Sequence, residues 1–164
     1  MISAILASTS TGGIGYKGTL PWPKHKEDLE WFREHTIGNI VVMGRKTWDD
    51  PKMPKPLPNR VNCVVSNNII DNYNVRRLKG NIKKEVLALQ EQFPEKDVFI
   101  IGGKAIYEAT ETIVDTIYLT RMKLNWWTDT RVHLDRMLMP FQLRTVRPGN
   151  DCTYEIWVRK STLK

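Results

Sequence analysis

The sequence predicts one α/β domain over residues 1–164, built on a twisted, mostly parallel β-sheet with helices on both faces and a C-terminal antiparallel hairpin. Short apolar runs rich in Ile and Val recur along the chain, and their lack of alternation is typical of strands buried on both faces of a parallel sheet. Helical patterns separate several of these runs, as they do in α/β folds. No linker or repeat divides the 164 residues, a length that suits one domain with a substantial core.

The apolar runs predict five parallel strands. In chain order they are ISAILAS (residues 2–8), NIVVMG (39–44), VNCVVS (61–66), DVFIIGG (97–103) and TIYLTRM (116–122). Helical patterns between some of them predict helices at Lys26–Thr36, Ile82–Gln92 and Lys104–Thr112. The last segments, FQLRTVR (141–147) and TYEIWVRK (153–160), alternate more strongly, and PGND between them indicates a turn. Together they predict the hairpin.

Composition excludes several classes of protein. A hydrophobic content of 41% argues against a disordered chain, and no apolar run is long enough to span a bilayer. The apolar N-terminus lacks a preceding cationic segment, which favours a strand over a signal peptide. Cys63 and Cys152 lack paired spacing, so neither a disulfide framework nor a metal site is expected, and Cys63 is expected to be a buried, inert thiol. The cytoplasm is the expected compartment.

The net charge of +7 leaves several interpretations open. Basic residues neutralise nucleic-acid phosphates, but a positive field also attracts small anionic ligands, and a basic surface can simply be solvated. Lys and Arg are dispersed here apart from short pairs such as Arg76-Arg77 and Lys83-Lys84. The dispersion favours the second and third interpretations.

The stretch LPWPKHKEDLEWF (residues 20–32) contains an acidic residue in an unexpected position. Helical phase places Asp28 on the same face as Leu29 and Phe32. The glutamates Glu27, Glu30 and Glu34 lie on the opposite face and are expected in solvent. Asp28 is either a first-turn acid favoured by the helix dipole or a carboxylate lining an apolar pocket. In the second case it needs a partner to offset its desolvation.

A glycine pattern near the N-terminus matches a dinucleotide fingerprint only in its letters. Residues 13–18, GIGYKG, fit G-x-G-x-x-G, but the fingerprint requires a helix to begin at the third glycine. Pro21 and Pro23 follow instead, which prevents that helix. A mobile glycine-rich loop that closes over a site is the better interpretation.

Three predicted strand ends carry groups suited to an anionic ligand. One strand is followed by the residues Gly44, Arg45, Lys46 and Thr47, another by Gly102 and Gly103, and a third by Ser66 and Asn67. Cations, hydroxyls and helix-start amides bind anions, and glycines let a ligand approach the backbone. Ligands of open α/β sheets bind at the carboxyl ends of strands. These strand ends therefore predict an extended anionic ligand such as a dinucleotide.

At this point six motifs in order resemble the dihydrofolate reductase family over nearly the whole chain. They are IGxxGxLPW (residues 14–22), DLxWF (28–32), VMGRKTW (42–48), PLPNR (56–60), IIGGxxIY (100–107) and YLT (118–120). The resemblance implies a dihydrofolate reductase-like fold and the reduction of 7,8-dihydrofolate by NADPH, with hydride transfer from nicotinamide C4 to pterin C6 and protonation at N5. It further implies a monomer that binds these two small molecules and neither nucleic acid nor membrane.

The resemblance also implies roles for individual residues. Asp28 would bind the pterin N3 and 2-amino group, Thr120 would orient Asp28, and Trp22 would hold a water near the pterin. The substrate site would contain Ile5, Ala7, Asp28, Leu29, Phe32, Leu57, Arg60, Ile101 and Thr120. Of these, Arg60 would bind the substrate's glutamate carboxylate. Desolvation is expected to raise the pKa of Asp28 above the usual range.

The implied cofactor site is larger. It would contain Ala7, Ile14, Gly15, Gly44, Arg45, Lys46, Thr47, Ser66, Asn67, Gly102, Gly103, Lys104, Ala105 and Tyr107. Arg45 and Ser66 would bind the 2′-phosphate and so favour NADPH over NADH. The histidines His25, His35 and His133 have no motif support and are expected to be structural or on the surface.

The sequence departs from the family pattern at two places. The loop between Trp48 and Pro56 is longer than in compact bacterial members. Where members often use Gly-Asp to hold the mobile loop closed, this chain has Thr128 and Asp129, which puts loop-closing kinetics in doubt.

Two alternative functions are a related pyrimidine reductase of riboflavin synthesis and a basic nucleic-acid-binding module that stacks bases on the six tryptophans.

Overall fold

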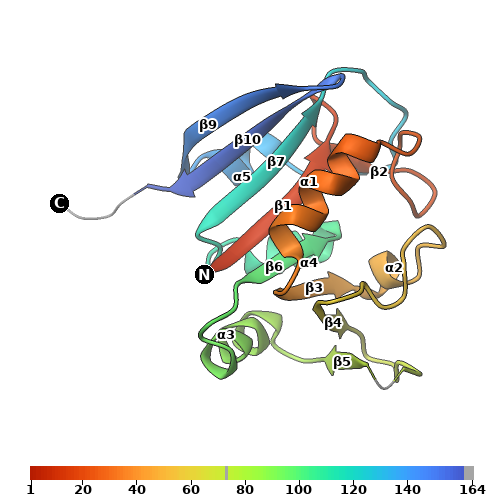
Figure 1. Ribbon diagram of the computed structural model, residues 1–164, viewed down its shortest axis with the longest axis vertical. Coiled ribbons are helices and arrows are strands. Elements are labelled where there is room, and N and C mark those ends of the chain that lie inside the picture. Colours follow the sequence, from red (N-terminus) through yellow and green to blue (C-terminus); the bar gives the residue numbers. More distant parts are fainter. Residues whose placement is uncertain (73, 161–164) are drawn as a thin grey trace.

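The structure is a computed structural model that describes residues 1–72 and 74–160, and an eight-stranded sheet runs through it in the order β5-β4-β3-β6-β1-β7-β10-β9 (Figure 1). The strands are β1 (Ile2–Ser8), β3 (Ile40–Gly44), β4 (Val61–Val65), β5 (Val75–Leu78), β6 (Val98–Gly102), β7 (Thr116–Met122), β9 (Phe141–Gly149) and β10 (Cys152–Arg159). A second, two-stranded sheet pairs β2 (Gly13–Gly15) with β8 (Thr130–Arg131).

Strand direction agrees with the sequence prediction. All neighbours from β5 to β7 pair in parallel. At the other edge β10 runs antiparallel to β7, and β9 runs antiparallel to β10. The predicted C-terminal hairpin is therefore confirmed, and it extends the parallel sheet by two strands. Strand β5 was not predicted, because its sequence VRRL carries two arginines and lies at the sheet edge, where little apolar surface is buried.

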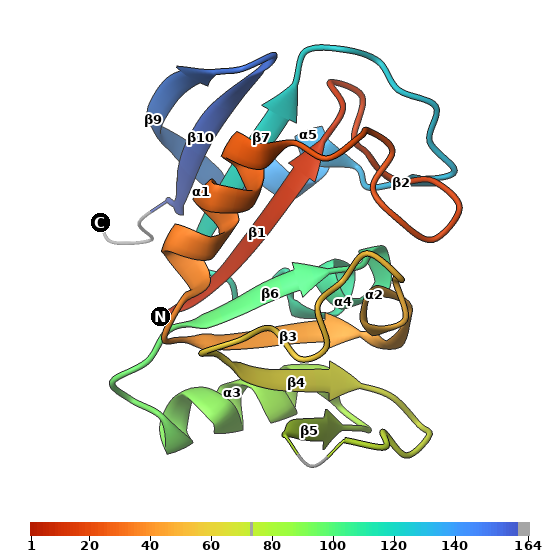
Figure 2. The same cartoon turned by 45° about the vertical axis from the view of Figure 1, so that its right-hand side comes forward.

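Helices cover both faces of the sheet, as predicted (Figure 2). They are α1 (Lys26–Thr36), α2 (Arg45–Trp48), α3 (Ile82–Gln92), α4 (Lys104–Thr110) and α5 (Leu134–Leu138). One core cluster joins α3, α4 and α5 to alternate strand residues such as Ile100 and Leu119. The other joins Trp31 of α1 and Trp48 of α2 to the opposite set, including Val41 and Phe99. The period of two along each strand thus supplies two separate cores.

Helix ends follow from local hydrogen bonds. Helices α1 and α3 occupy the predicted residues, and α3 begins after Asn81, whose side chain accepts a hydrogen bond from the backbone N–H of Lys84. Helix α4 ends two residues before the predicted Thr112, because a turn closed by the N–H of Ile113 and the carbonyl of Thr110 follows it. The short elements α2, α5, β2 and β8 have too few residues to show a period.

None of the helices in the described residues is long and apolar enough to cross a membrane.

Candidate active site

The carboxyl ends of β1, β3, β6 and β7 lie at the same end of the sheet because these strands are parallel (Figure 2). This end is called the carboxyl edge below. Helix α2 begins directly after β3 and helix α4 directly after β6, and Gly44 and Gly103 precede their first residues. Gly44 is tightly packed, since a Cβ there would lie 3.0 Å from Ile106 Cγ1 and would require that side chain to shift. Gly102 has a φ of +123°, which L-residues rarely adopt. Two of the three strand ends singled out in the sequence, those of β3 and β6, are therefore neighbours in space.

Asp28 lies at the same edge, in the first turn of α1, and has a partner. The hydroxyl of Thr120 on β7 donates a hydrogen bond of 2.7 Å to Asp28 Oδ1. Desolvation raises the pKa of the Asp28 carboxyl, whereas the hydrogen bond from Thr120 acts to lower it. The direction of this pKa shift and the contact with Thr120 both agree with the expectation. Asp28 is consequently a first-turn acid and also a partly buried, paired carboxylate.

The apolar residues expected around the substrate mostly belong to one cluster. Ile5, Trp22 and Leu57 are buried in the core on the α1 side of the sheet, and Ala7, Phe32 and Ile101 pack against it. Leu29 differs, since it is 45% exposed and lies outside that cluster. The expectation that Leu29 shares the buried face of α1 is wrong, because Trp31 fills that position.

Arg60 is held beside this cluster by two hydrogen bonds. Its Nε donates to the carbonyl of Pro58 over 2.9 Å, and its Nη1 donates to Thr36 Oγ1 over 3.0 Å. The guanidinium lies 5.9 Å from the ring centroid of Phe32. Arg60 is thus a fixed cation at the far end of α1 from Asp28, suited to a carboxylate on an extended ligand.

Arg45 and Ser66 also lie together, as the resemblance implies. Arg45 Nη1 is 3.4 Å from Ser66 Oγ, while Arg45 Nε donates to both carboxylate oxygens of Asp49 at 3.1 Å. Arg77, which the sequence analysis did not assign to the site, donates from Nη1 to the carbonyl of Asn67 over 3.2 Å. Two guanidinium groups therefore flank the Ser66-Asn67 strand end, and only one was expected there.

Tyr107 is not placed to bind a phosphate through its hydroxyl. It is buried, and its hydroxyl donates a 2.8 Å hydrogen bond to the carbonyl of Ile5. Burial raises its pKa. A Cβ on Gly102 would lie 3.3 Å from this hydroxyl and 3.5 Å from Thr47 Oγ1. Tyr107 therefore lies beneath the glycine pair, while Thr47 lies against it from α2.

The glycine-rich loop forms the expected irregular structure with no helix after Gly18. Lys17 and Gly18 have positive φ values of 50° and 79° and form a turn between the bridged residues Tyr16 and Thr19. Asp129 holds this loop: its N–H donates to the carbonyl of Gly15, and its Oδ2 accepts from the N–H of Lys17, each over 2.9 Å.

Thr128 takes part in the same loop contact through packing. A Cβ on Gly13 would lie 2.4 Å from Thr128 Cγ2, so the methyl group of Thr128 occupies the space above Gly13. The position that often carries glycine in the family carries Thr128 here, and the glycine that allows close approach is on the opposing strand β2.

Two residues at the start of α1 make contacts that the sequence did not predict. Glu27 was expected in solvent, but its Oε1 accepts hydrogen bonds from the backbone of Asn150 and the hydroxyl of Tyr154, each over 2.9 Å. His25, which had no assigned role, caps α1 by accepting a hydrogen bond from the N–H of Asp28 over 3.0 Å. The partners of Glu27 come from the other end of the chain, so helical phase alone does not reveal them.

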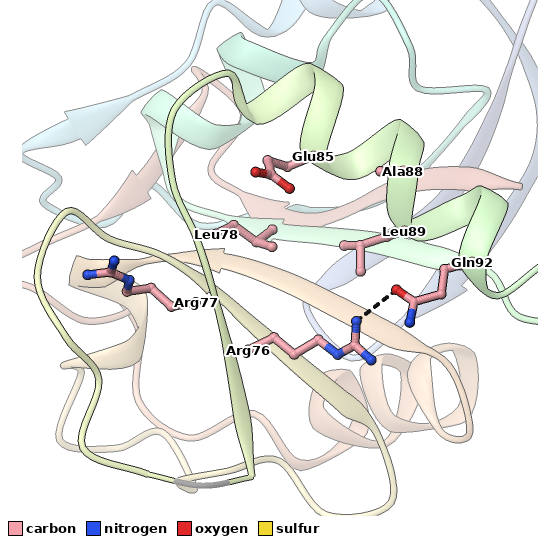
Figure 3. Close-up of a pocket in the computed structure, with 7 residues that line it drawn as sticks. All are labelled: Arg76, Arg77, Leu78, Glu85, Ala88, Leu89 and Gln92. Atoms are coloured by element: carbon pink, nitrogen blue, oxygen red, sulfur yellow. Dashed lines mark hydrogen bonds between the residues drawn. The ribbon is translucent and has the colours of Figure 1, made fainter.

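A cavity of about 420 Å³ lies elsewhere, between β5 and α3 (Figure 3). It is lined by Arg76, Arg77, Leu78, Glu85, Ala88, Leu89 and Gln92. A 2.8 Å hydrogen bond from Arg76 Nη1 to Gln92 Oε1 crosses it. None of the residues expected in the substrate or cofactor site from the sequence lines this cavity. Arg77 connects the two places, because it lines the cavity and also donates to the carbonyl of Asn67 at the end of β4.

Comparisons with known proteins agree with this geometry. Residues 1–141 match the family model described as dihydrofolate reductase. The chain is 36% identical over 138 residues to dihydrofolate reductase type 9 of Escherichia coli, covering 81% of this chain and 76% of that protein. It is 43% identical over 123 residues to a bifunctional dihydrofolate reductase-thymidylate synthase of Paramecium tetraurelia, covering 73% of this chain and 25% of that protein.

A solved structure is similar over almost the full length. It is dihydrofolate reductase from Enterococcus faecalis complexed with NADP(H) and RAB-propyl, with a TM-score of 0.87 and 28% sequence identity. The superposition covers 98% of this chain and 97% of that one. The two chains therefore share one fold over almost their whole length.

Proposed function

The chain belongs to the dihydrofolate reductase family, and we propose that the residues at the carboxyl edge of its sheet carry out that family's reaction. The protein is an oxidoreductase that reduces 7,8-dihydrofolate to 5,6,7,8-tetrahydrofolate with NADPH. The observation that carries the residue assignment is the hydrogen-bonded pair of Asp28 and Thr120 beside two glycine-led helix starts. Family membership favours this reaction over a pyrimidine reductase or a nucleic-acid-binding module.

Asp28 binds and orients the pterin ring in this proposal. A carboxylate accepts hydrogen bonds at both oxygens, which suits the adjacent N3–H and 2-amino donors of the pterin. Because Thr120 donates to Oδ1, the plane of the carboxylate is held in one orientation. We assign Ile5, Phe32 and Leu57, which lie in or pack against one core cluster, to apolar contact with the pterin, and Leu29 is 45% exposed. Arg60 binds the carboxylate of the substrate's glutamate tail.

The residues present fit NADPH. Its nicotinamide supplies the hydride that reduces pterin C6, and the protein holds the two rings in line. A Cβ on Gly103 would meet only Thr47 Oγ1, at 3.8 Å, so the backbone between β6 and α4 is open to close approach. Lys46, Lys104 and Ala105 are exposed at the two helix starts, beside Thr47. These groups suit the pyrophosphate, and Ile14 and Gly15 of the loop approach the nicotinamide side.

Trp22 and Asp28 support the protonation step, and Arg45 and Ser66 support the choice of cofactor. No described residue accepts a hydrogen bond from the buried Nε1–H of Trp22, and we assign it to an ordered water that delivers the proton for pterin N5. Asp28, with its raised pKa, favours protonation there electrostatically. Arg45 and Ser66 bind the 2′-phosphate, and Asn67 lies beside them.

We further propose a single domain over residues 1–164 that acts as a monomer in the cytoplasm.

The direct test follows NADPH absorbance in the presence of dihydrofolate. Wild type should consume NADPH, and Asp28→Asn should lower kcat/KM by about 100-fold or more. Arg45→Gln should raise the KM for NADPH by about tenfold while leaving the KM for NADH nearly unchanged. Equal rates for wild type and Asp28→Asn would remove Asp28 from its role, and no turnover with wild type at several pH values would contradict the reaction itself.

A further inference from the structure

The first turn of α1 is held by the turn between β9 and β10. His25 precedes the helix, and its imidazole bridges two backbones. Nδ1 accepts the N–H of Asp28 over 3.0 Å, and Nε2 lies 2.7 Å from the carbonyl of Asn150. Because a carbonyl only accepts and an N–H only donates, these contacts place a ring proton on Nε2 and the accepting lone pair on Nδ1.

Glu27 makes the second connection to the same turn. Its Oε1 accepts hydrogen bonds from the N–H of Asn150 and the hydroxyl of Tyr154, and Cys152 Sγ lies 4.0 Å away. The hydrogen bonds from Asn150 and Tyr154 lower the pKa of the Glu27 carboxyl. The residues His25, Glu27, Asn150 and Tyr154 are called the hairpin contact below.

The turn is shaped for close approach. A Cβ on Gly149 would lie 2.5 Å from Glu27 Oε1 and 2.4 Å from Tyr154 Cε2. Asp151, the last residue of the turn, has a φ of +55°. Any side chain at position 149 would therefore push the turn away from α1.

A metal site at this place is a competing interpretation. One ligand atom each from His25, Glu27 and Cys152 lies within 4.8 Å of the others. Both imidazole nitrogens are already occupied by backbone groups, however, and Glu27 Oε1 accepts two hydrogen bonds. The cluster is better explained by these hydrogen bonds than by a bound cation.

The hairpin contact and the Asp28 contact are directly adjacent. Tyr154 of β10 and Thr120 of β7 are register partners in the sheet. These neighbouring cross-strand residues donate hydrogen bonds to neighbouring helix residues, Tyr154 to Glu27 and Thr120 to Asp28. The first turn of α1 is thus attached to the sheet at two points side by side.

We propose that His25 and Glu27 are positioning residues for dihydrofolate binding, which act by attaching the first turn of α1 to the β9–β10 turn so that the Asp28 carboxylate stays on Thr120. This proposal rests on the proposed role of Asp28 in binding the pterin. Neither residue touches the substrate. Without the hairpin contact the first turn would be held only through Thr120, and the carboxylate would lose part of its orientation. Cofactor binding should be unaffected, because α2 and α4 do not take part.

The experiment compares Glu27→Ala, Glu27→Gln, Tyr154→Phe and His25→Asn with wild type. Glu27→Ala should raise the KM for dihydrofolate about tenfold, with a smaller change in kcat and an unchanged Kd for NADPH. Glu27→Gln should be close to wild type, since an amide oxygen still accepts both bonds. His25→Asn keeps a helix cap but is too short to reach Asn150, so it should raise the same KM to a lesser extent. Glu34→Ala, an exposed acid on the same helix, is the matched control.

A second readout needs no turnover. The Asp28 carboxyl is titrated by carbon NMR in wild type and Tyr154→Phe. Because the bond from Thr120 lowers the pKa of Asp28, loosening that bond should raise the titration midpoint in Tyr154→Phe and leave it unchanged in Glu34→Ala.

The outcomes separate the two proposals. Turnover by wild type together with an unchanged KM in Glu27→Ala would overturn the positioning role and keep the function. Parallel losses of dihydrofolate and NADPH affinity, tracking thermal stability, would show a merely structural role and also overturn it. An inactive wild type would contradict the proposed function, and the titration would still decide whether the hairpin contact orients Asp28.

Discussion

At the scale of single residues, the position of Asp28 combines two opposing effects. Burial raises the pKa of the carboxyl, and the hydrogen bond from Thr120 lowers it, with burial the larger cause. The ionised form of this carboxylate is therefore less stable, relative to the protonated form, in the folded protein than in water. Binding sites commonly sacrifice stability in this way, because the ligand supplies the missing hydrogen bonds.

Replacing Asp28 should show how much the buried carboxylate destabilises the folded protein. The folded carboxyl binds its proton more tightly than the unfolded chain does, so its contribution to stability is present at acid pH. That contribution is lost as the pH rises from the unfolded pKa through the folded pKa. Asp28→Asn should accordingly raise the thermal midpoint of the ligand-free protein at neutral pH, with less gain in acid. Calorimetry at two pH values measures this, and a lower midpoint at neutral pH would contradict it.

Replacing Thr120 should move the same pKa further. Thr120→Val keeps the shape of the side chain and removes the hydroxyl that lowers the pKa of Asp28. The Asp28 limb of the pH–rate profile for hydride transfer should shift to higher pH. Thr116→Val, a buried threonine on the same strand, is the control and should leave the profile unchanged. A shift to lower pH in Thr120→Val would be inconsistent with this assignment.

At the scale of elements, the two faces of strands β7 and β10 have different roles: one contacts α1 at the site, and the other carries an ion pair. Thr120 and Tyr154 face α1, whereas Arg121 and Glu155 form an ion pair on the other side. Arg121 donates to both carboxylate oxygens of Glu155 over 2.9 and 3.1 Å, and Trp157 Nε1 donates over 2.9 Å. The period of two lets one strand pair orient the site and stabilise the sheet independently.

Glu155→Gln should therefore affect stability alone. Losing part of a buried, charge-assisted network costs about 2 kcal/mol, which urea unfolding would detect, and the KM for dihydrofolate should not change. Although desolvation acts to raise the pKa of Glu155, the hydrogen bonds from Arg121 and Trp157 lower it overall. The stabilisation is thus present above the usual carboxyl range and lost as the pH falls through the folded pKa, so the difference from wild type should shrink in acid. A changed KM would show coupling between the faces.

The pairing of β2 with β8 gives a prediction with a built-in rescue. Gly13→Ala places a methyl group 2.4 Å from Thr128 Cγ2, so the loop should no longer close on Asp129, and kcat should fall. Adding Thr128→Gly removes the clash and should restore kcat in the double variant, which steady-state kinetics would show. If the double variant is no better than Gly13→Ala, the packing of Thr128 on Gly13 is not what allows closure.

At the scale of the whole molecule, charge and topology act together. The chain carries a net charge of +7, and the parallel strands place their carboxyl ends, with Arg45 and Arg77, at one region. A positive field attracts an anionic cofactor over distances that salt shortens. The lysines and arginines are dispersed along the sequence, which favours a general positive field over a nucleic-acid-binding patch.

Salt should thus weaken cofactor binding selectively. Raising the ionic strength from about 0.01 M to about 1 M, which cuts the screening length about tenfold, should raise the KM for NADPH several-fold. The KM for dihydrofolate, which has fewer charges, should change less. Steady-state kinetics over a salt series would measure both, and equal effects on the two would argue against steering by the overall field.

Local patterns in the sequence by themselves determined most elements of the fold. Helix α1 and strand β1 were predicted to the residue. The 3.6-residue period marks the buried side of a helix, and an apolar run without alternation marks a strand that is buried on both faces. The predicted strand ends also brought Arg45, Ser66 and Gly102 together, because parallel strands end together, whereas Asp28 was assigned to the same site only through the family resemblance.

Only the tertiary structure decided which distant groups meet. Thr120 was paired with Asp28 only through the family resemblance, and the bond from Tyr154 to Glu27 spans 127 positions and was not expected at all. Helical phase placed Leu29 inside, which was wrong, and it did not reveal that Glu27 on the solvent side accepts a hydrogen bond from Tyr154. The physical reason is that hydrophobic periodicity shows which side of a segment is buried and does not show which residues lie opposite that side. A hydrogen-bond partner instead depends on the register of strands that are brought together only when the whole sheet has formed.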